Sequence, residues 1–285
     1  MKLRGKVAIV TGASKGIGKS IAETFAREGC ELTIVSRNLE EINAAASELK
    51  STYGTNTLAM KCDVSNFSEV DKMVRNTVEH FKRIDILVNN AGVLGPVGSL
   101  VDNDLELWEE TMNINLLGTV NCTKAVLPHM IKAGAGKIIN FSGAGVGSYA
   151  SPTLSAYVVS KHAIVAFTEI VAAEVKDYNI QVNSINPGAV DTRILDQIVE
   201  AKDKIDKNFW EKAKKHKETG GVPSWKVAEL ALYLASEDSD GITGKLLSVV
   251  RDDYKNFDKW LNEIKETSVY TLRRIDKVQY REVSK

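Results

Sequence analysis

Two residues whose types and spacing suit acid–base chemistry are Tyr157 and Lys161, which lie four positions apart. In a helix, residues at this spacing share one face. A phenol ordinarily ionises near pH ~10, and a cation held beside it favours the phenolate and lowers this pKa. The pair therefore suits a tyrosine that exchanges a proton near neutral pH. By itself the pattern is weak, because a chain with eight tyrosines and many lysines contains roughly one such pair by chance.

A glycine-rich turn near the start of the chain predicts a nucleotide site. The apolar run 7–10 predicts a buried strand, and apolar residues after the turn repeat at helical spacing up to Gly29. Glycines let the backbone approach a pyrophosphate, and a helix N-terminus offers free N–H groups. A tight turn that needs glycine only for its geometry is the alternative. The turn reads Thr11-Gly12-Ala13-Ser14-Lys15-Gly16-Ile17-Gly18.

The end of the second predicted strand, 32–35, bears on the choice of nucleotide. In nucleotide-binding folds an acidic side chain here accepts hydrogen bonds from the ribose, whereas a basic one accommodates a 2′-phosphate. The sequence has Ser36 and Arg37 at this point, and Lys15 lies within the glycine turn. Two cations and no carboxylate predict NADP(H) as cofactor, with NAD(H) as the less favoured choice. Two solvated surface bases are the alternative interpretation.

The rest of the chain alternates strands with amphipathic helices, which predicts an α/β fold with a parallel sheet and right-handed crossovers. Ligands then belong beyond the C-terminal ends of the strands. A long predicted helix over 105–132 carries Asn113, Asn115 and Gly118 in its middle, and asparagine inside a helix usually needs a reason. The remaining strands are expected at 57–61, 84–88, 137–141, 180–185 and 244–250.

Composition limits the class of protein. The chain has 285 residues, is 44% hydrophobic and carries 37 basic against 37 acidic side chains. This balance argues against a nucleic-acid surface or a polybasic membrane anchor. Cys30, Cys62 and Cys122 form no motif, which predicts a reducing compartment without disulfides or a metal site. The first apolar run is too short for a signal peptide, and no other segment is expected to span a bilayer, so we expect a cytoplasmic protein.

The motifs together resemble those of the short-chain dehydrogenase/reductase family. They occur in the family's order and spacing over about residues 5–248. The resemblance implies a single Rossmann-type, doubly wound domain over 1–250, with seven parallel strands, helices on both faces and a substrate lid at 193–222. The motifs are Gly12-x-x-x-Gly16-Ile17-Gly18, Asp63-Val64, Asn89-Asn90-Ala91-Gly92, Asn115, Tyr157-x-x-x-Lys161, and Pro187-Gly188 with Thr192.

The same resemblance implies roles for individual residues. Tyr157 would be the general acid in carbonyl reduction and the base in alcohol oxidation. Lys161 would hold the nicotinamide ribose and lower the tyrosine pKa, and Asn115 would hold a water that links Lys161 to solvent. With Lys15 and Arg37 added, the candidate cofactor-binding residues are Gly12, Ser14, Lys15, Gly16, Ile17, Gly18, Arg37, Asp63, Val64, Asn90, Ala91, Gly92, Tyr157, Lys161, Pro187, Gly188, Val190 and Thr192.

One position departs from the family pattern. The family usually places a substrate-orienting serine three residues after the asparagine of the fifth strand, and here that residue is Gly143. We expect Ser142 to take this role through a flexible glycine-rich loop, with Ser148 as the substitute. The alternative is that no serine serves and the rate is lower, since substrate alignment and proton donation are separable contributions.

The last segment, 251–285, is expected to be a helical extension. Phe257, Trp260, Leu261 and Ile264 repeat at i, i+3, i+4 and i+7, which predicts an amphipathic helix. An apolar stripe of this length should pack on the domain, over its cleft, or on a partner subunit. The lysines of the lid are matched by nearby acids and indicate no substrate.

The function expected from these features is an NADP(H)-dependent oxidoreductase that interconverts a carbonyl and a secondary alcohol on a small polar or sugar-like molecule. A 3-oxoacyl thioester reductase is the alternative within the same class. A cofactor-binding regulatory protein with decayed catalysis is the alternative of another class, suggested by Gly143. The resemblance implies a homodimer or homotetramer formed through the helices at 105–132 and 155–176. No metal, nucleic acid or membrane is expected as a partner.

Overall fold

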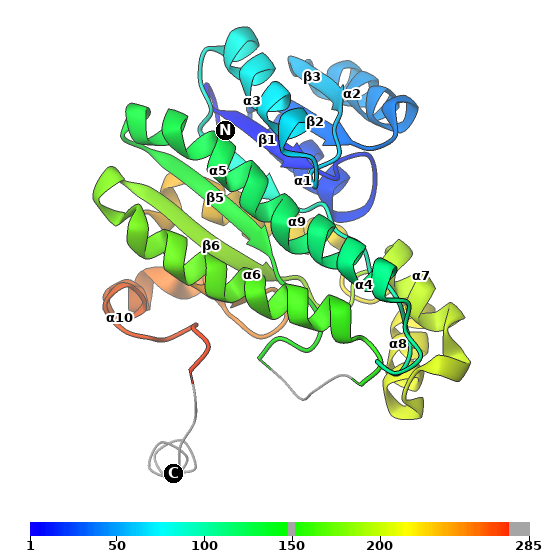
Figure 1. The fold of residues 1–285 in the computed structure, drawn as a ribbon. Coiled ribbons are helices and arrows are strands. Elements are labelled where there is room, and N and C mark those ends of the chain that lie inside the picture. Colours follow the sequence, from blue (N-terminus) through cyan, green and yellow to red (C-terminus); the bar gives the residue numbers. More distant parts are fainter. Residues whose placement is uncertain (148–151, 274–285) are drawn as a thin grey trace.

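A computed structural model describes residues 1–147 and 152–273 of the chain. Its centre is a seven-stranded sheet in the order β3-β2-β1-β4-β5-β6-β7, in which every paired strand is parallel (Figure 1). The expected α/β fold with seven parallel strands is therefore confirmed. The strands are β1 Val7–Thr11, β2 Glu31–Ser36, β3 Thr57–Lys61, β4 Ile86–Asn89, β5 Gly136–Phe141, β6 Ile180–Asn186 and β7 Leu246–Ser248.

Helices cover both faces of the sheet, because parallel strands bury both of their faces. One apolar core joins the sheet to α1, α2, α9 and the C-terminal segment, and a second joins it to α3, α5 and α6. The α-helices are α1 Gly16–Arg27, α2 Leu39–Tyr53, α3 Phe67–Phe81, α4 Leu105–Met112, α5 Gly118–Ala133, α6 Ser155–Glu174, α7 Arg193–Glu200, α8 Lys207–Thr219, α9 Ser224–Ala235 and α10 Leu261–Glu266.

The strand order reverses between β1 and β4, which makes their C-terminal ends the point where a ligand crevice forms. Thr11, the last residue of β1, holds the two ends together. Its hydroxyl accepts hydrogen bonds from the backbone N–H groups of Asn90 and Ala91, each at 3.0 Å. The glycine turn and the segment after β4 therefore start side by side.

The helix expected over 105–132 is interrupted in its middle. Between α4 and α5 the chain forms a π-helical turn, Asn113–Leu117, and α5 continues from Gly118. A Cβ added at Gly118 would lie 2.5 Å from a methyl carbon of Val64, so glycine is required where α5 crosses the segment after β3. The prediction of one continuous helix was wrong because Asn115 turns into the protein at this π turn, a feature often found at functional sites.

The helix α6 is long and apolar enough to cross a membrane by length and composition. Half of its most apolar window is buried within this protein, where it packs on β5 and β6. Its apolar composition is therefore that of a core helix.

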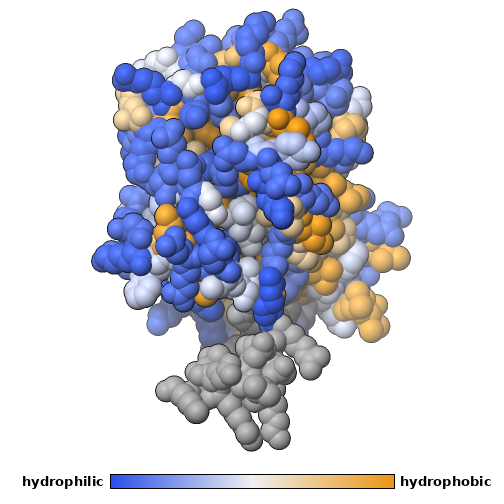
Figure 2. Space-filling model, turned by 90° about the vertical axis from the view of Figure 1, so that its left-hand side faces the viewer, coloured by the Kyte–Doolittle hydropathy of each residue, from blue (hydrophilic) through white to orange (hydrophobic). Residues whose placement is uncertain are grey.

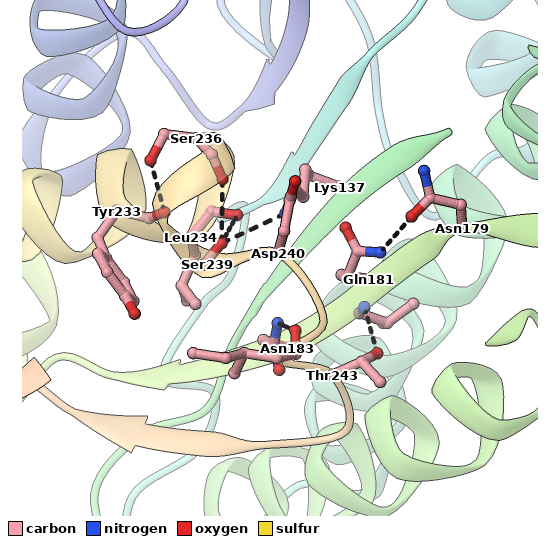
Figure 3. A network of polar contacts seen from close by, with 12 residues as sticks. Lys137, Asn179, Gln181, Asn183, Tyr233, Leu234, Ser236, Ser239, Asp240 and Thr243 are labelled. Atoms are coloured by element: carbon pink, nitrogen blue, oxygen red, sulfur yellow. Dashed lines mark hydrogen bonds and ion pairs between the residues drawn. The ribbon is translucent and has the colours of Figure 1, made fainter. Parts of the chain in front are cut away.

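A polar network fixes the connection between α9 and β7 to the sheet (Figure 3). The ammonium group of Lys137, on β5, donates to Asp240 at 2.7 Å, and burial lowers the pKa of this lysine. On β6, the side-chain amide of Asn183 donates to the carbonyl of Ile242 at 2.7 Å. Lys137 lies near the N-terminal end of β5 and Asn183 in the middle of β6, and neither residue lines the crevice.

The C-terminal segment packs on the domain as far as it is described. It begins with a 3-10 helix, Tyr254–Trp260, followed by the short α10, so the predicted amphipathic α-helix is only partly α-helical. Phe257 stacks near Tyr233 of α9 and near Tyr270. The backbone N–H of Leu246 donates to the carbonyl of Tyr270 at 2.7 Å, so the segment covers the outer edge of β7. The last twelve residues, 274–285, lie outside the described part.

Replacement of Phe257 by alanine should lower the free energy of unfolding by about 3–5 kcal/mol, the usual loss for a buried aromatic ring. Phe257 is only 2% exposed, whereas Trp260 in the same 3-10 helix is 59% exposed. Trp260→Ala is therefore the matched control and should change stability by less than about 1 kcal/mol. Urea unfolding followed by circular dichroism measures both. Equal effects of the two variants would contradict the packing described for this segment.

Candidate active site

A cavity of about 720 Å³ opens at the C-terminal ends of the strands. It runs from the turn after β1 past the ends of β2 and β3 to α6 and the start of α7. Sixteen of the twenty residues singled out from the sequence line it, and the exceptions are Gly18, Asn115, Gly188 and Val190. The sixteen are Gly12, Ser14, Lys15, Gly16, Ile17, Arg37, Asp63, Val64, Asn90, Ala91, Gly92, Ser142, Tyr157, Lys161, Pro187 and Thr192.

The glycine turn is packed so closely that side chains are excluded from it. A Cβ at Gly18 would lie 2.3 Å from the carbonyl oxygen of Gly12, and Gly12 itself has a φ of +65°. The side-chain amide of Asn90 donates to the carbonyls of Thr11 and Gly12, at 2.9 and 3.1 Å, and so holds the turn in place. Gly18 is therefore needed for packing behind the turn, although it does not line the cavity. The exposed backbone of the turn at the start of α1 fits a pyrophosphate.

The segment after β3 forms the opposite wall of this end of the cavity. The carboxylate of Asp63 accepts from the backbone N–H and the hydroxyl of Ser65, at 2.9 and 2.7 Å, which fixes the bend. The side-chain amide of Asn121, on α5, donates to the carbonyl of Val64 at 3.0 Å. Asn121 was not singled out from the sequence. Its one distinguishing feature in the sequence is its position one helical turn after Gly118.

Tyr157 and Lys161 project from α6 at the other end of the cavity. Both side chains are buried, with 7% and 4% of their surface exposed. The Lys161 ammonium donates to the carbonyl of Phe141 at 3.0 Å and lies 5.7 Å from the centroid of the Tyr157 ring. The α6 helix, expected from the i, i+4 spacing, thus places both groups against the end of β5.

The pKa of Tyr157 in this structure differs from the sequence-based expectation. Burial raises the pKa of the phenol to about 12 and lowers the pKa of the Lys161 ammonium to about 8. Desolvation disfavours the charged form of each group, and this outweighs the attraction of the cation for a phenolate. At neutral pH the site therefore holds a protonated phenol beside a protonated lysine.

Asn115 acts on the backbone around the site. Its carboxamide oxygen accepts from the backbone N–H of Val93 at 2.8 Å, and its amide donates to the Val93 carbonyl at 2.9 Å. The same amide donates to the hydroxyl of Ser160 at 3.0 Å, and Ser160 donates to the carbonyl of Tyr157 at 2.7 Å. Asn115 thus connects the segment after β4 with the first turn of α6. Ser160 was missed from the sequence, although its position between the tyrosine and the lysine was a usable signal.

The loop after β5 brings a glycine against the tyrosine. A Cβ at Gly143 would lie 2.5 Å from the Tyr157 hydroxyl oxygen, so the hydroxyl occupies space that any other residue would need. The hydroxyl of Ser142 is buried and donates to the carbonyl of Ile185 on β6 at 3.1 Å. For Ser142 to orient a substrate, this hydrogen bond must first be given up. Ser148, the substitute candidate, lies outside the described residues.

The segment 193–222 contains α7 and α8 and is tied to the end of β6. Lys217, on α8, forms ion pairs with Asp191 at 2.5 Å and with Asp196 at 2.8 Å. Leu195 and Ile198, on α7, belong to the same apolar cluster as Tyr157. The cluster keeps water away from the phenol, which explains the raised pKa of that group.

A carboxylate that the sequence analysis did not place at the glycine turn is found there. Glu41, in the first turn of α2, accepts a hydrogen bond from the Ser14 hydroxyl at 3.1 Å and pairs with Lys15 at 3.4 Å. The strand end and the turn carry two cations, as the sequence indicates, but the cavity there also holds this carboxylate from α2. The residue was missed because only positions adjoining the end of β2 were considered, whereas the first turn of α2 folds back over the turn.

Comparisons with known proteins agree with this geometry. Residues 6–203 match the family profile described as short chain dehydrogenase. The chain is 40% identical over 245 residues to oxidoreductase UcpA of Salmonella typhimurium, covering 85% of this chain and 92% of that protein. It is 39% identical over 253 residues to the 3-oxoacyl-[acyl-carrier-protein] reductase FabG of Chlamydia trachomatis, covering 87% and 96%. Among solved structures, NAD⁺-bound xylitol dehydrogenase superposes with a TM-score of 0.80 at 30% identity, covering 87% and 98%.

The buried lysine makes stability depend on pH in a defined window. The pKa of Lys161 is about 8 in the folded protein and 10.5 in the unfolded chain, so the unfolded state binds more protons between these values. The contribution of Lys161 to the free energy of unfolding should therefore rise by up to about 1.4 kcal/mol per pH unit from pH 8 to pH 10. The buried cysteines titrate with the opposite sign in this range, so the quantity to compare is the difference in slope between the parent and Lys161→Met, which urea unfolding at pH 7, 8, 9 and 10 measures. An equal slope in both proteins would contradict the burial of a titrating ammonium.

Proposed function

Because this chain belongs to the short-chain dehydrogenase/reductase family, we propose that it is an NADP(H)-dependent oxidoreductase that interconverts a carbonyl and a secondary alcohol. The single observation that carries the proposal is the cavity that begins at the glycine turn and ends at the buried Tyr157 and Lys161. A bound nicotinamide dinucleotide supplies or accepts the hydride.

The proposed chemistry of the protein is the transfer of one proton. Burial keeps the phenol of Tyr157 protonated at neutral pH, so the residue is ready to donate to a carbonyl oxygen. Lys161 remains largely protonated at pH 7, since its pKa is about 8, and stabilises the phenolate that the donation leaves behind. The apolar cluster around Tyr157 excludes water from this step.

The residues that would hold the dinucleotide are those of the glycine turn, Arg37 and the segments after β3 and β4. The preference for NADP(H) is supported by Lys15 and Arg37, which both line the cavity at the end away from Tyr157. NAD(H) is the alternative, and it is supported by the similarity to NAD⁺-bound xylitol dehydrogenase.

The proposed substrate is a small polar or sugar-like molecule. The structural similarity to xylitol dehydrogenase supports a polyol or sugar. The sequence similarity to the 3-oxoacyl-[acyl-carrier-protein] reductase favours the alternative, a 3-oxoacyl thioester. Turnover of a polyol panel and of acetoacetyl thioesters under the same conditions separates the two.

We also propose a homodimer or homotetramer in the cytoplasm. Leu117 at the end of the π turn, Ile131 on α5, and Val159 and Ile170 on α6 are between 37% and 59% exposed. A row of apolar side chains on two adjacent helices is typical of a surface that a second copy covers. Figure 2 shows that apolar residues on its side of the molecule gather toward the right-hand edge, while most of the remaining visible surface is hydrophilic.

Replacement of Tyr157 by phenylalanine should lower kcat by about 10²–10⁴-fold, since proton transfer is lost while the ring is kept. Binding of the dinucleotide should change little, and nicotinamide fluorescence measures it independently of turnover. A parent protein that binds the dinucleotide but reduces no carbonyl would contradict catalysis and support the regulatory alternative. A Tyr157→Phe variant as active as its parent would contradict the assigned acid.

Neutralisation of both Lys15 and Arg37 should abolish a preference for NADPH over NADH. The loss should be about tenfold or more, because two cations near a phosphate dianion are removed. The measurement is a fluorescence titration of Lys15→Met/Arg37→Met and of the parent with both dinucleotides. A matched control is Lys19→Met, which removes a cation from α1 that pairs with Glu48. An unchanged ratio in the double variant would show that these are surface charges.

A further inference from the structure

The carboxylate of Glu41 lies among the cations on which the choice of cofactor rests. It lines the same cavity as Ser14, Lys15, Ser36 and Arg37. One of its oxygens accepts from the Ser14 hydroxyl at 3.1 Å, and the Lys15 ammonium lies 3.4 Å from the carboxylate. Glu41 therefore bridges the start of α2 to the glycine turn.

The position of Glu41 follows from the way α2 begins. The hydroxyl of Ser36 donates to the carbonyl of Asn38 at 2.8 Å, which bends the chain directly after β2. The side chain of Asn38 then accepts from the backbone N–H groups of Glu40 and Glu41, at 3.0 and 3.1 Å. This cap fixes the first turn of the helix, so that Glu41 reaches the cavity.

The neighbouring Glu40 has the same charge in the same helical turn but does not line the cavity. Like Glu41, it lies in the first turn of α2, and it is only one residue nearer to Arg37 in the chain. Glu40 is therefore a matched reference for any effect that comes only from negative charge at the start of α2.

The charges at this end of the cavity respond differently to the two cofactors. A 2′-phosphate is a strong anion that two cations attract, whereas an unmodified ribose offers hydroxyl groups that a carboxylate can accept. With Glu41 paired to Lys15, one of the two cations is neutralised, and within the described residues Arg37 takes part in no ion pair. The net charge of the three groups is thus +1, where the sequence analysis counted +2.

We propose that Glu41 is a specificity-determining residue that lowers the preference of this protein for NADP(H) over NAD(H) by neutralising Lys15. This role rests on the proposed function, since it concerns the dinucleotide that the cavity would hold. Glu41 is suited to the hydroxyl groups of an unmodified ribose, and the nearby Arg37 is suited to a 2′-phosphate. The ratio of the affinities for NADP(H) and NAD(H) then depends also on a residue that lies outside the end of β2 and the glycine turn.

The test compares Glu41→Gln with Glu40→Gln in the full-length protein. Glutamine keeps the size of the side chain and its ability to accept from Ser14, and removes only the charge. Fluorescence titration with NADPH and NADH should show the affinity ratio in Glu41→Gln moving toward NADPH by roughly five- to tenfold in 0.05 M salt. The shift should shrink in 0.5 M salt, because these groups are partly exposed. Glu40→Gln should move the ratio less than about twofold.

A second measurement uses ligands that lack the nicotinamide half of the cofactor, so contacts near Tyr157 and Lys161 do not contribute to it. Calorimetric titration with adenosine 2′,5′-bisphosphate and with adenosine 5′-monophosphate isolates the contribution of the 2′-phosphate. Glu41→Gln should strengthen binding of the first and leave the second nearly unchanged. In a Lys15→Met background the effect of Glu41→Gln on the bisphosphate should fall below about twofold.

Each other result overturns a defined part of the proposal. An affinity ratio that moves equally in Glu41→Gln and Glu40→Gln would overturn the role of Glu41, while the dinucleotide site would stand. A Glu41→Gln effect that persists undiminished without Lys15 would overturn the route through that lysine. Failure of the parent protein to bind either dinucleotide would overturn the proposed function itself, and the role of Glu41 with it.

Discussion

The contact between Thr11 and Asn90 joins the two strand ends between which the cavity opens. The Thr11 hydroxyl receives two backbone N–H groups from the segment after β4, and the Asn90 amide returns hydrogen bonds to the carbonyls of Thr11 and Gly12. The two strands are paired as far as Val10 and Val88, and these hydrogen bonds continue the link beyond the ladder to the glycine turn. The absence of a Cβ at Gly18 lets this contact form, since a side chain there would collide with the Gly12 carbonyl and the Asn90 amide.

Desolvation governs the other end of the cavity. Tyr157 and Lys161 are both buried, and each is held closer to its neutral form than in water. The arrangement is maintained by hydrogen bonds to the backbone, from Lys161 to Phe141 and from Ser160 to Tyr157, with Asn115 behind them. A phenol kept protonated beside an ammonium suits proton donation, because the cation can stabilise the phenolate that would form.

The C-terminal segment supports the site from outside the cavity. None of its residues described between 251 and 273 lines the cavity. The carbonyl of Tyr270 accepts a hydrogen bond from the backbone N–H of Leu246, at the outer edge of β7. The contact occupies an N–H group of the edge strand that another chain could otherwise pair with. Arg273 forms an ion pair with Glu169 on α6 at 2.7 Å. Its ion pair also ties the helix that carries Tyr157 to the far edge of the sheet.

The sequence by itself determined the parallel sheet, the place of the ligand crevice and the helix that carries Tyr157 and Lys161, because hydrophobic periodicity and glycine spacing are local properties of the chain. It did not determine the directions of the pKa shifts, since burial depends on how Leu195 and Ile198 pack from a distant segment. Nor did it determine the π turn at Asn115, the hydrogen bond that engages Ser142, or the carboxylate of Glu41 beside Lys15. Each of these rests on a contact between elements far apart in sequence. Only the tertiary structure brings such groups within hydrogen-bond distance of one another.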